Sequence, residues 1–193
     1  MKIRSIIITI ILVLLQVNGH AQVPLARDRV TIDNEISAKI KKFKTVAPGR
    51  LESSMKIKVP WDDRSLFDQE LDCFTKSYLI NDTIKITGYM IGELGYGFEL
   101  KLFGDSCIVA PYGLSDGEIY KYNKTDTKYV NLIKLSSKSH KVFLSKHPSF
   151  REGEIIEGYV ELDSYPFYYK GLNGKFSIEV KAYFKTDAVK TSH

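Results

Sequence analysis

Residues 176–185 read FSIEVKAYFK, and this stretch decides the fold. Its apolar side chains occupy every second position, which is the period of a β-strand that buries one face. The positions between them are polar or amphipathic, as expected of a face that meets water. The pattern therefore predicts a long strand whose buried face carries Phe176, Ile178, Val180, Ala182 and Phe184.

A second stretch, residues 155–162, repeats the alternation. Antiparallel pairing of the two stretches would bring Glu157 and Glu161 near Lys181 and Lys185. Each cross-strand pair of opposite charge contributes roughly 0.2 to 1 kcal/mol, so we expect these strands to be neighbours. The buried face of the second strand would carry Ile156, Gly158, Val160 and Leu162.

Period-2 alternation begins near residue 83 and continues to residue 144, interrupted by turn-forming residues at 104–105, 111–117 and 123–126. The whole pattern amounts to about eight strands in roughly 100 residues, which predicts a mainly β fold. An antiparallel β-sandwich is the expected arrangement, and a small antiparallel barrel is the alternative.

Two similar segments stand 70 positions apart: residues 86–89 and 156–159 both read Ile-x-Gly-Tyr. A glycine inside a strand often marks a place where a neighbouring group approaches closely. We therefore expect an aromatic side chain to cross over Gly88 and another over Gly158. An internal duplication and chance both explain the similarity.

Residues 1–21 have the features of a signal peptide: Lys2 and Arg4, an apolar run over 6–15, and small residues at Gly19 and Ala21. The alternative is an uncleaved anchor, but about 20 apolar residues are needed to span a bilayer. We expect an exported, periplasmic or extracellular protein with no transmembrane segment after cleavage.

Two short helices are expected before the sheet. Ile32, Ile36, Ile40 and Phe43 form a helical stripe, and a second helix is expected over residues 64–74. The expected organisation is a signal peptide over 1–21, an N-terminal arm and short helix over 22–50, and a single β-rich domain over 51–193.

Cleavage of the leader removes two cations, so the formal net charge falls from +5 to +3. Such a weak balance, without a dense basic run carrying interleaved aromatics, argues against nucleic acid as a partner. The two cysteines, Cys73 and Cys107, would lie in an oxidising compartment, and a disulfide between them is the default expectation.

Few residues indicate catalysis. Cys107 could act as a nucleophile with His140 or His147 as the base and Asp105 to orient the imidazole, but the local sequence matches no nucleophile elbow. The acidic group over residues 62–72 lacks calcium-ligand spacing, and its carboxylates are best explained by helix capping and solubility. No catalytic residue, metal site or cofactor is therefore expected.

The loop over residues 163–174 carries four aromatic residues within five positions: Tyr165, Phe167, Tyr168 and Tyr169. Aromatic side chains offer large rigid contact area, so these four are the candidate binding residues for an unknown protein or glycan. In the structural alternative, Tyr165 and Phe167 close the end of the sandwich while Tyr168 and Tyr169 pair with a neighbouring strand.

These observations favour an exported, non-catalytic binding protein, and an enzyme is less expected. One alternative is a secreted hydrolase that uses carboxylates or Cys107. Another is an inhibitor or immunity-type protein that offers a strand edge to its target.

Overall fold

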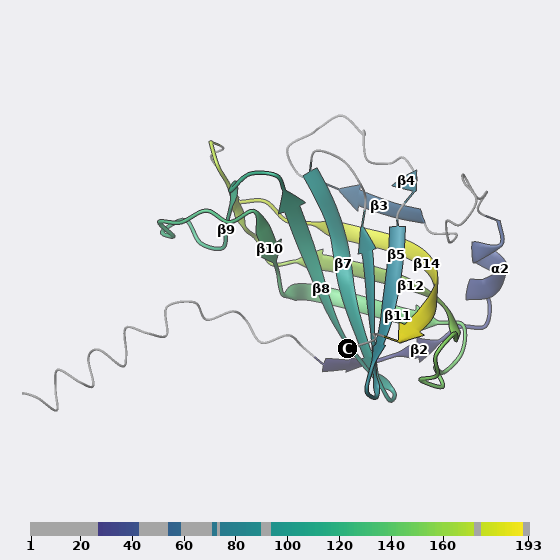
Figure 1. Cartoon of the computed structure of the whole chain (residues 1–193). Coiled ribbons are helices and arrows are strands. Elements are labelled where there is room, and N and C mark those ends of the chain that lie inside the picture. The colour runs from purple at the N-terminus through teal and green to yellow at the C-terminus, as the bar shows by residue number, and fades with distance from the viewer. Residues whose placement is uncertain are drawn as a thin grey trace, which may run out of the picture.

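The computed structural model describes residues 27–42, 54–58, 71–72, 74–89, 94–171 and 175–190, and they form a mainly β fold (Figure 1). Most strands belong to one sheet that is nearly closed, like a barrel, in the order β1-β8-β7-β6-β5-β14-β12-β11-β2. The elements are β1 Arg27–Arg29, β2 Thr31–Ile32, α2 Ile36–Ile40, β3 Ser54–Lys58, β4 Leu71–Asp72, β5 Phe74–Ile80, β6 Thr83–Tyr89, β7 Leu94–Phe103, β8 Ser106–Ser115, β9 Tyr120–Lys121, β10 Leu132–Lys134, β11 Ser137–Leu144, β12 Ile155–Ser164, β13 Tyr168–Tyr169 and β14 Glu179–Lys190.

The N-terminal segment connects the two edges of the nearly closed sheet. β1 pairs with β8 at one end of the strand order, and β2 pairs with β11 at the other end. Only Val30 separates β1 from β2, so one short segment joins the two edges of the sheet. We call this junction the seam.

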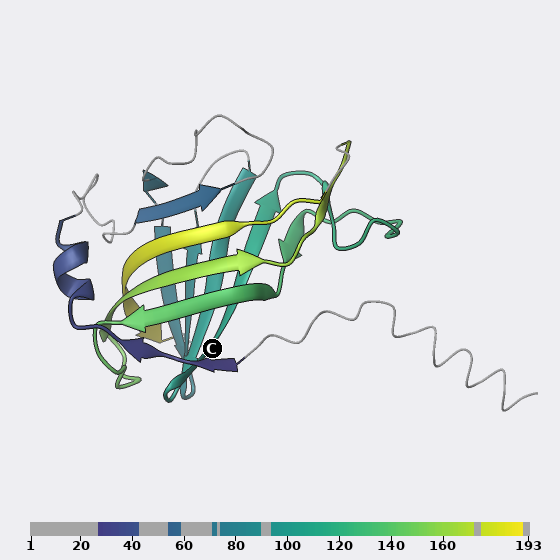
Figure 2. The same ribbon diagram turned by 180° about the vertical axis from the view of Figure 1, so that it is seen from behind.

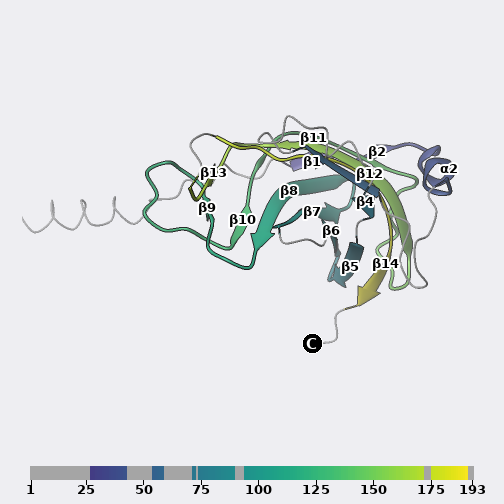
Figure 3. The ribbon, with the colours of Figure 1, turned by 90° about the horizontal axis from the view of Figure 1, so that it is seen from above.

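The strands lie in two curved layers. β5 to β8 form one layer, and β11, β12 and the first part of β14 form the other, as the front and back views show (Figures 1 and 2). Seen from above, the layers bend toward each other at β14 (Figure 3). β14 pairs with β12 and β3 and then, at its end, with β5.

The strand pairing is mixed, which corrects the expectation of a purely antiparallel fold. β14 runs parallel to β5, and β2 runs parallel to β11. All other pairs between the strands given above are antiparallel. The pair of β14 with β5 forms because β14 is long enough to leave one layer and join the other.

The predicted pairing of the two longest alternating stretches is confirmed. Glu157 lies opposite Lys185 and Glu161 opposite Lys181, with ion pairs of 3.1 and 3.6 Å. Both predicted apolar faces are buried. Alternation and charge thus specify this register together.

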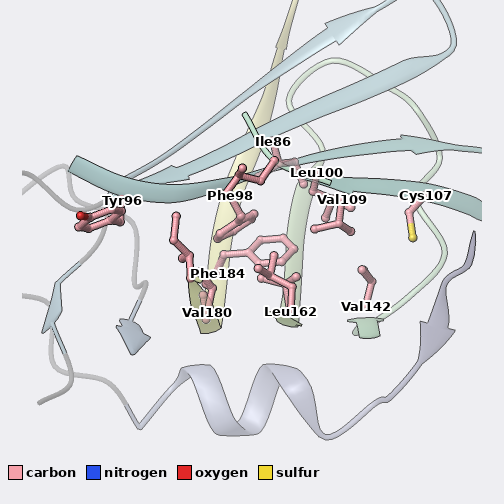
Figure 4. Close-up of a cluster of buried hydrophobic side chains, with 14 of the residues drawn as sticks. Ile86, Tyr96, Phe98, Leu100, Cys107, Val109, Val142, Leu162, Val180 and Phe184 are labelled. Atoms are coloured by element: carbon pink, nitrogen blue, oxygen red, sulfur yellow. The ribbon is translucent and has the colours of Figure 1, made fainter. Parts of the chain in front are cut away.

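Aromatic rings cross over both glycines, as expected. A side chain on Gly88 would overlap the ring of Phe98, and one on Gly158 would overlap the ring of Phe184. The two phenylalanines come from different layers and meet in the core, with ring centroids 5.9 Å apart (Figure 4).

Three local expectations are wrong or only partly met. β8 continues through Pro111 and Gly113, where a loop was expected. The end of the predicted second helix is extended, since residues 71–72 and 74–80 are strands, and residues 64–70 lie outside the described part. Of the first helix, residues 36–40 are helical, whereas Thr31 and Ile32 form β2.

Pro111 is tolerated because of where it stands. It lies opposite Phe98 of β7, and its carbonyl accepts a hydrogen bond of 2.8 Å from the Leu135 N–H on the other side. The N–H and C=O of a strand residue point to the same side, so the donor that proline lacks is not needed for pairing with β7. At this position β8 changes its second partner from β1 to β10.

Helix α2 packs on β12 and β14, and its two isoleucines, Ile36 and Ile40, are buried. The Ser37 hydroxyl donates a hydrogen bond to Glu157, which ties the helix to β12. Within the residues described, no helix is long and apolar enough to cross a membrane.

Candidate functional site

The aromatic loop lies at one end of the barrel, where β13 pairs with β9 (Figure 3). Phe167 is completely buried and exchanges two backbone hydrogen bonds with Phe176, of 2.8 and 2.9 Å. Tyr168 and Tyr169 form β13, and Tyr165 remains 39% exposed. Residues 172–174 of the predicted loop lie outside the described part.

Phe167 and Tyr169 point into the barrel. Both rings pack on Tyr120 of β9, with centroids 5.7 and 5.6 Å from its ring, and both also contact Phe176. Edge-to-face contacts of this kind contribute roughly 0.5 to 1.5 kcal/mol each beyond the area they bury. The loop is therefore fixed by its inward rings.

Tyr165 and Tyr168 do not share this role. Tyr168 alternates with the inward Tyr169, so its side chain points to the outer side of β13 beside Lys121 of β9. The ammonium of Lys121 lies 4.4 Å from the ring centre of Tyr129, and that of Lys170 lies 5.5 Å from it. We call the group formed by Tyr129, Tyr165, Tyr168, Lys121 and Lys170 the end surface.

The inward side of the same end holds buried tyrosine hydroxyls. Burial raises the pKa of Tyr120 to about 12 and also raises the pKa of Tyr96, whose hydroxyl lies near that of Tyr120. The Tyr120 hydroxyl donates to the Leu114 carbonyl at 3.4 Å. These phenols stay neutral at physiological pH and serve the packing of the barrel end.

Cys107 is buried and carries a free thiol. The expected disulfide is therefore not seen at Cys107, and Cys73, its expected partner, lies outside the described residues.

The environment of Cys107 does not suit a nucleophile. Burial raises the pKa of Cys107 to about 11, with the charge of Asp28 adding to the shift. Asp105 pairs with His147 at 3.3 Å, as expected of an orienting acid, but both side chains are largely exposed whereas Cys107 is buried. The structure therefore gives Cys107 the environment of an inert core thiol.

Three polar side chains, Asp28, Ser137 and His140, lie together at the seam. The His140 Nε2 atom lies 2.9 Å from a carboxylate oxygen of Asp28, and its Nδ1 atom lies 2.8 Å from the Ser137 hydroxyl. The Ser137 hydroxyl donates to the Val109 carbonyl at 3.2 Å, and the group connects β1, β8 and β11.

Sequence reasoning missed this group. Ser137 and His140 are close in the chain, but Asp28 is more than 100 residues away in a short polar segment with no period. The one sequence feature that points to the group is that Ser137 and His140 stand three residues apart, and this spacing alone does not indicate a site.

The acidic group offers no metal site in the described part of the chain. Asp62, Asp63, Asp68 and Glu70 lie outside it, and Asp72 belongs to β4. Among the residues that are described, no cluster of histidine, cysteine and carboxylate side chains could hold a metal ion.

No family model matches the chain, and no curated protein or solved structure matches it. The function has to be argued from the arrangement of its own residues.

Proposed function

We propose that the chain is an exported, non-catalytic binding protein that contacts a protein or glycan partner through the end surface. The observation that carries the proposal is that two side chains of the aromatic loop are anchored inside the barrel and two lie at its surface. Phe167 and Tyr169 are anchored among buried rings, while Tyr165 and Tyr168 stay at the surface. The anchored rings fix the loop that carries the outer ones.

Such an arrangement suits recognition for physical reasons. A ring held on a fixed backbone loses little conformational entropy when it meets a partner. Lys121 and Lys170 flank Tyr129 and add charge beside the rings. Binding residues are commonly carried on loops that a rigid scaffold positions.

Recovery of a partner from the native envelope fraction tests the proposal. The mature chain with Tyr165→Ser and Tyr168→Ser should retain its circular dichroism spectrum and lose the partner. The matched control is Tyr78→Ser on β5, which is also a partly exposed tyrosine but stands away from the end surface. Equal recovery by the double variant and the control would reject the end surface.

The seam group supports a second candidate, a secreted hydrolase in which the Ser137 hydroxyl attacks and His140 accepts its proton. Ser137, His140 and Asp28 stand in the order of a nucleophile, base and orienting acid, with 2.8 Å between the Ser137 hydroxyl and Nδ1 and 2.9 Å between Nε2 and the Asp28 carboxylate. Against it, the imidazole side chain is only 3% exposed, and the Ser137 hydroxyl also binds a backbone carbonyl. Covalent labelling of Ser137 by a fluorophosphonate probe would favour this candidate, and an unlabelled chain would remove it.

The inhibitor alternative stays a prediction. It requires an open strand edge, and β1 and β2 pair with the two strands that would otherwise be free at the seam.

A further inference from the structure

The outer face of β5 to β8 carries a row of aromatic side chains. The strand register places Phe74, Tyr89, Gly97 and Tyr112 side by side on four neighbouring strands. The rings of Phe74 and Tyr89 are stacked, with centroids 5.8 Å apart. The row therefore begins as a continuous aromatic surface on β5 and β6.

Gly97 lets the row continue across β7. A Cβ atom on Gly97 would lie 2.8 Å from the ring of Tyr112, so the end of that ring crosses over the glycine. The Tyr112 hydroxyl donates to the Gly88 carbonyl on β6, at 3.4 Å. All three aromatic side chains of the row are half-buried.

The same face is strongly basic. Outward positions of β1, β5 to β8 and β10 hold one carboxylate, Glu99, against six cations. The cations are Arg27, Arg29, Lys76, Lys85, Lys101 and Lys134.

Glu99 organises the lysines next to the aromatic row. Its carboxylate pairs with Lys85 at 2.9 Å, with Lys101 at 3.7 Å and with Lys134. One carboxylate holds three ammonium groups in place and neutralises only one of them. Lys134, which lies opposite Tyr112, places part of the remaining charge beside the aromatic row.

The opposite layer has a comparable aromatic row without this charge. Phe143, Tyr159 and Tyr183 stand on adjacent strands, with centroids 6.2 and 4.6 Å apart. There Lys181 pairs with Glu161 and Glu179, Lys185 pairs with Glu157, and α2 packs on two of the strands. Of the two layers, as far as the described residues show, the outer face of β5 to β8 is the one that combines aromatic rings with an excess of cations.

We propose that the outer face of β5 to β8 binds an acidic polysaccharide. Tyr89 and Tyr112 stack on the apolar faces of sugar rings, and the lysines around Glu99 pair with the carboxylates of the glycan. The Tyr112 ring crosses Gly97, which lies directly opposite Tyr89, so the two tyrosines form one aromatic platform for a sugar ring. This site is separate from the end surface.

Native gel electrophoresis of the mature chain in gels containing polygalacturonate tests the proposal. Polygalacturonate should retard the chain, whereas hydroxyethylcellulose, which is neutral, should not. Tyr89→Ala and Tyr112→Leu should each weaken retardation about fivefold to tenfold. The Lys76→Gln/Lys101→Gln pair leaves Lys85 and Lys134 on Glu99, and it should weaken retardation severalfold at low salt and less at high salt.

Two controls separate this site from the rest of the surface. Lys141→Gln/Lys181→Gln changes the same number of charges on the opposite layer, and Tyr165→Ala changes the end surface; both should bind polygalacturonate as the unchanged chain does. Circular dichroism checks the folding of each variant, and Tyr112→Leu retains an apolar cover over Gly97.

Three results would overturn the proposal. The first is an unchanged chain that polygalacturonate does not retard. The second is equal retardation by dextran sulfate or a single-stranded oligonucleotide that survives both tyrosine substitutions, because charge alone would then account for binding. The third is loss of retardation in Tyr165→Ala, which would assign binding to the end surface.

Discussion

The rings of Phe98 and Phe184 lie 5.9 Å apart between the two layers, and each also covers a glycine on the neighbouring strand of its own layer. Gly88 lies directly opposite Phe98, and Gly158 lies directly opposite Phe184. The two Ile-x-Gly-Tyr segments therefore have the same role in their respective layers. This equivalence is what an internal duplication would produce.

Gly88→Ala and Gly158→Ala should each destabilise the protein by about 1 to 3 kcal/mol, because a methyl group would overlap a buried ring that has little room to move. Urea unfolding followed by circular dichroism measures the loss. Gly117→Ala is the matched control, since its nearest neighbouring atom would lie 4.0 Å away. Two variants as stable as this control would contradict the packing of Phe98 and Phe184.

The thiol of Cys107 should resist alkylation in the native protein and react after denaturation without a reductant. With a pKa of about 11, roughly one thiol in a thousand is ionised at about pH 8, and burial slows access further. Mass spectrometry of the labelled peptide gives the result. Labelling that appears only after reduction would restore the disulfide.

The seam should depend on the contact between Asp28 and His140. His140→Ala leaves the carboxylate without this partner and removes a nearly buried side chain, so it should cost about 1 to 3 kcal/mol. Amide hydrogen exchange should rise in β8 where β1 pairs with it. Asp163→Asn, which alters an exposed hydrogen bond to Ser139, is the control, and equal exchange in both variants would contradict the role of the seam.

Glu99 should make stability fall in acid. Burial alone would raise the pKa of Glu99, but hydrogen bonds from Lys134 and Lys85 outweigh burial and hold the pKa below its usual value. A carboxylate with a lowered pKa in the folded state contributes stability above its unfolded pKa, about 4.3, and loses it as pH falls through the folded value. The urea midpoint of Glu99→Gln should therefore change less between about pH 7 and pH 3 than that of the unchanged chain. Parallel pH profiles would show that the lysine cluster has no such effect.

The sequence predicts those parts of the fold in which apolar and polar residues alternate over a long strand. Residues 155–162 and 176–185 carry both a buried face and complementary charges, so their register follows from the residues alone. The glycine positions were predictable for a similar reason, since a gap in an apolar face requires a neighbour to fill it.

Barrel closure could not be predicted in the same way. β1 and β2 are three and two residues long, too short to show a period, and β1 reads Arg-Asp-Arg. Pro111 signals a loop in isolation, and only the change of partner from β1 to β10 explains why a strand continues through it. Tertiary pairing overrides local propensity at both places.

The sequence predicts where the candidate site lies but not which of its side chains point inward and which point outward. The density of rings at 165–169 indicated the loop, but four aromatics give no alternation that separates inward from outward side chains. Phe167 is buried because it pairs with Phe176, and Tyr165 is exposed because it follows the end of β12. The row formed by Phe74, Tyr89 and Tyr112 depends on pairing between three hairpin strands and β5, which was not expected to be a strand.

Site-specific photo-crosslinking in the native envelope tests the binding proposal most directly. A photoreactive phenylalanine analogue at position 165 or 168 should form a covalent adduct with the partner, because these side chains lie at the end surface. The same analogue at position 78 should form none. Adducts at position 78 with none at positions 165 and 168 would contradict the account.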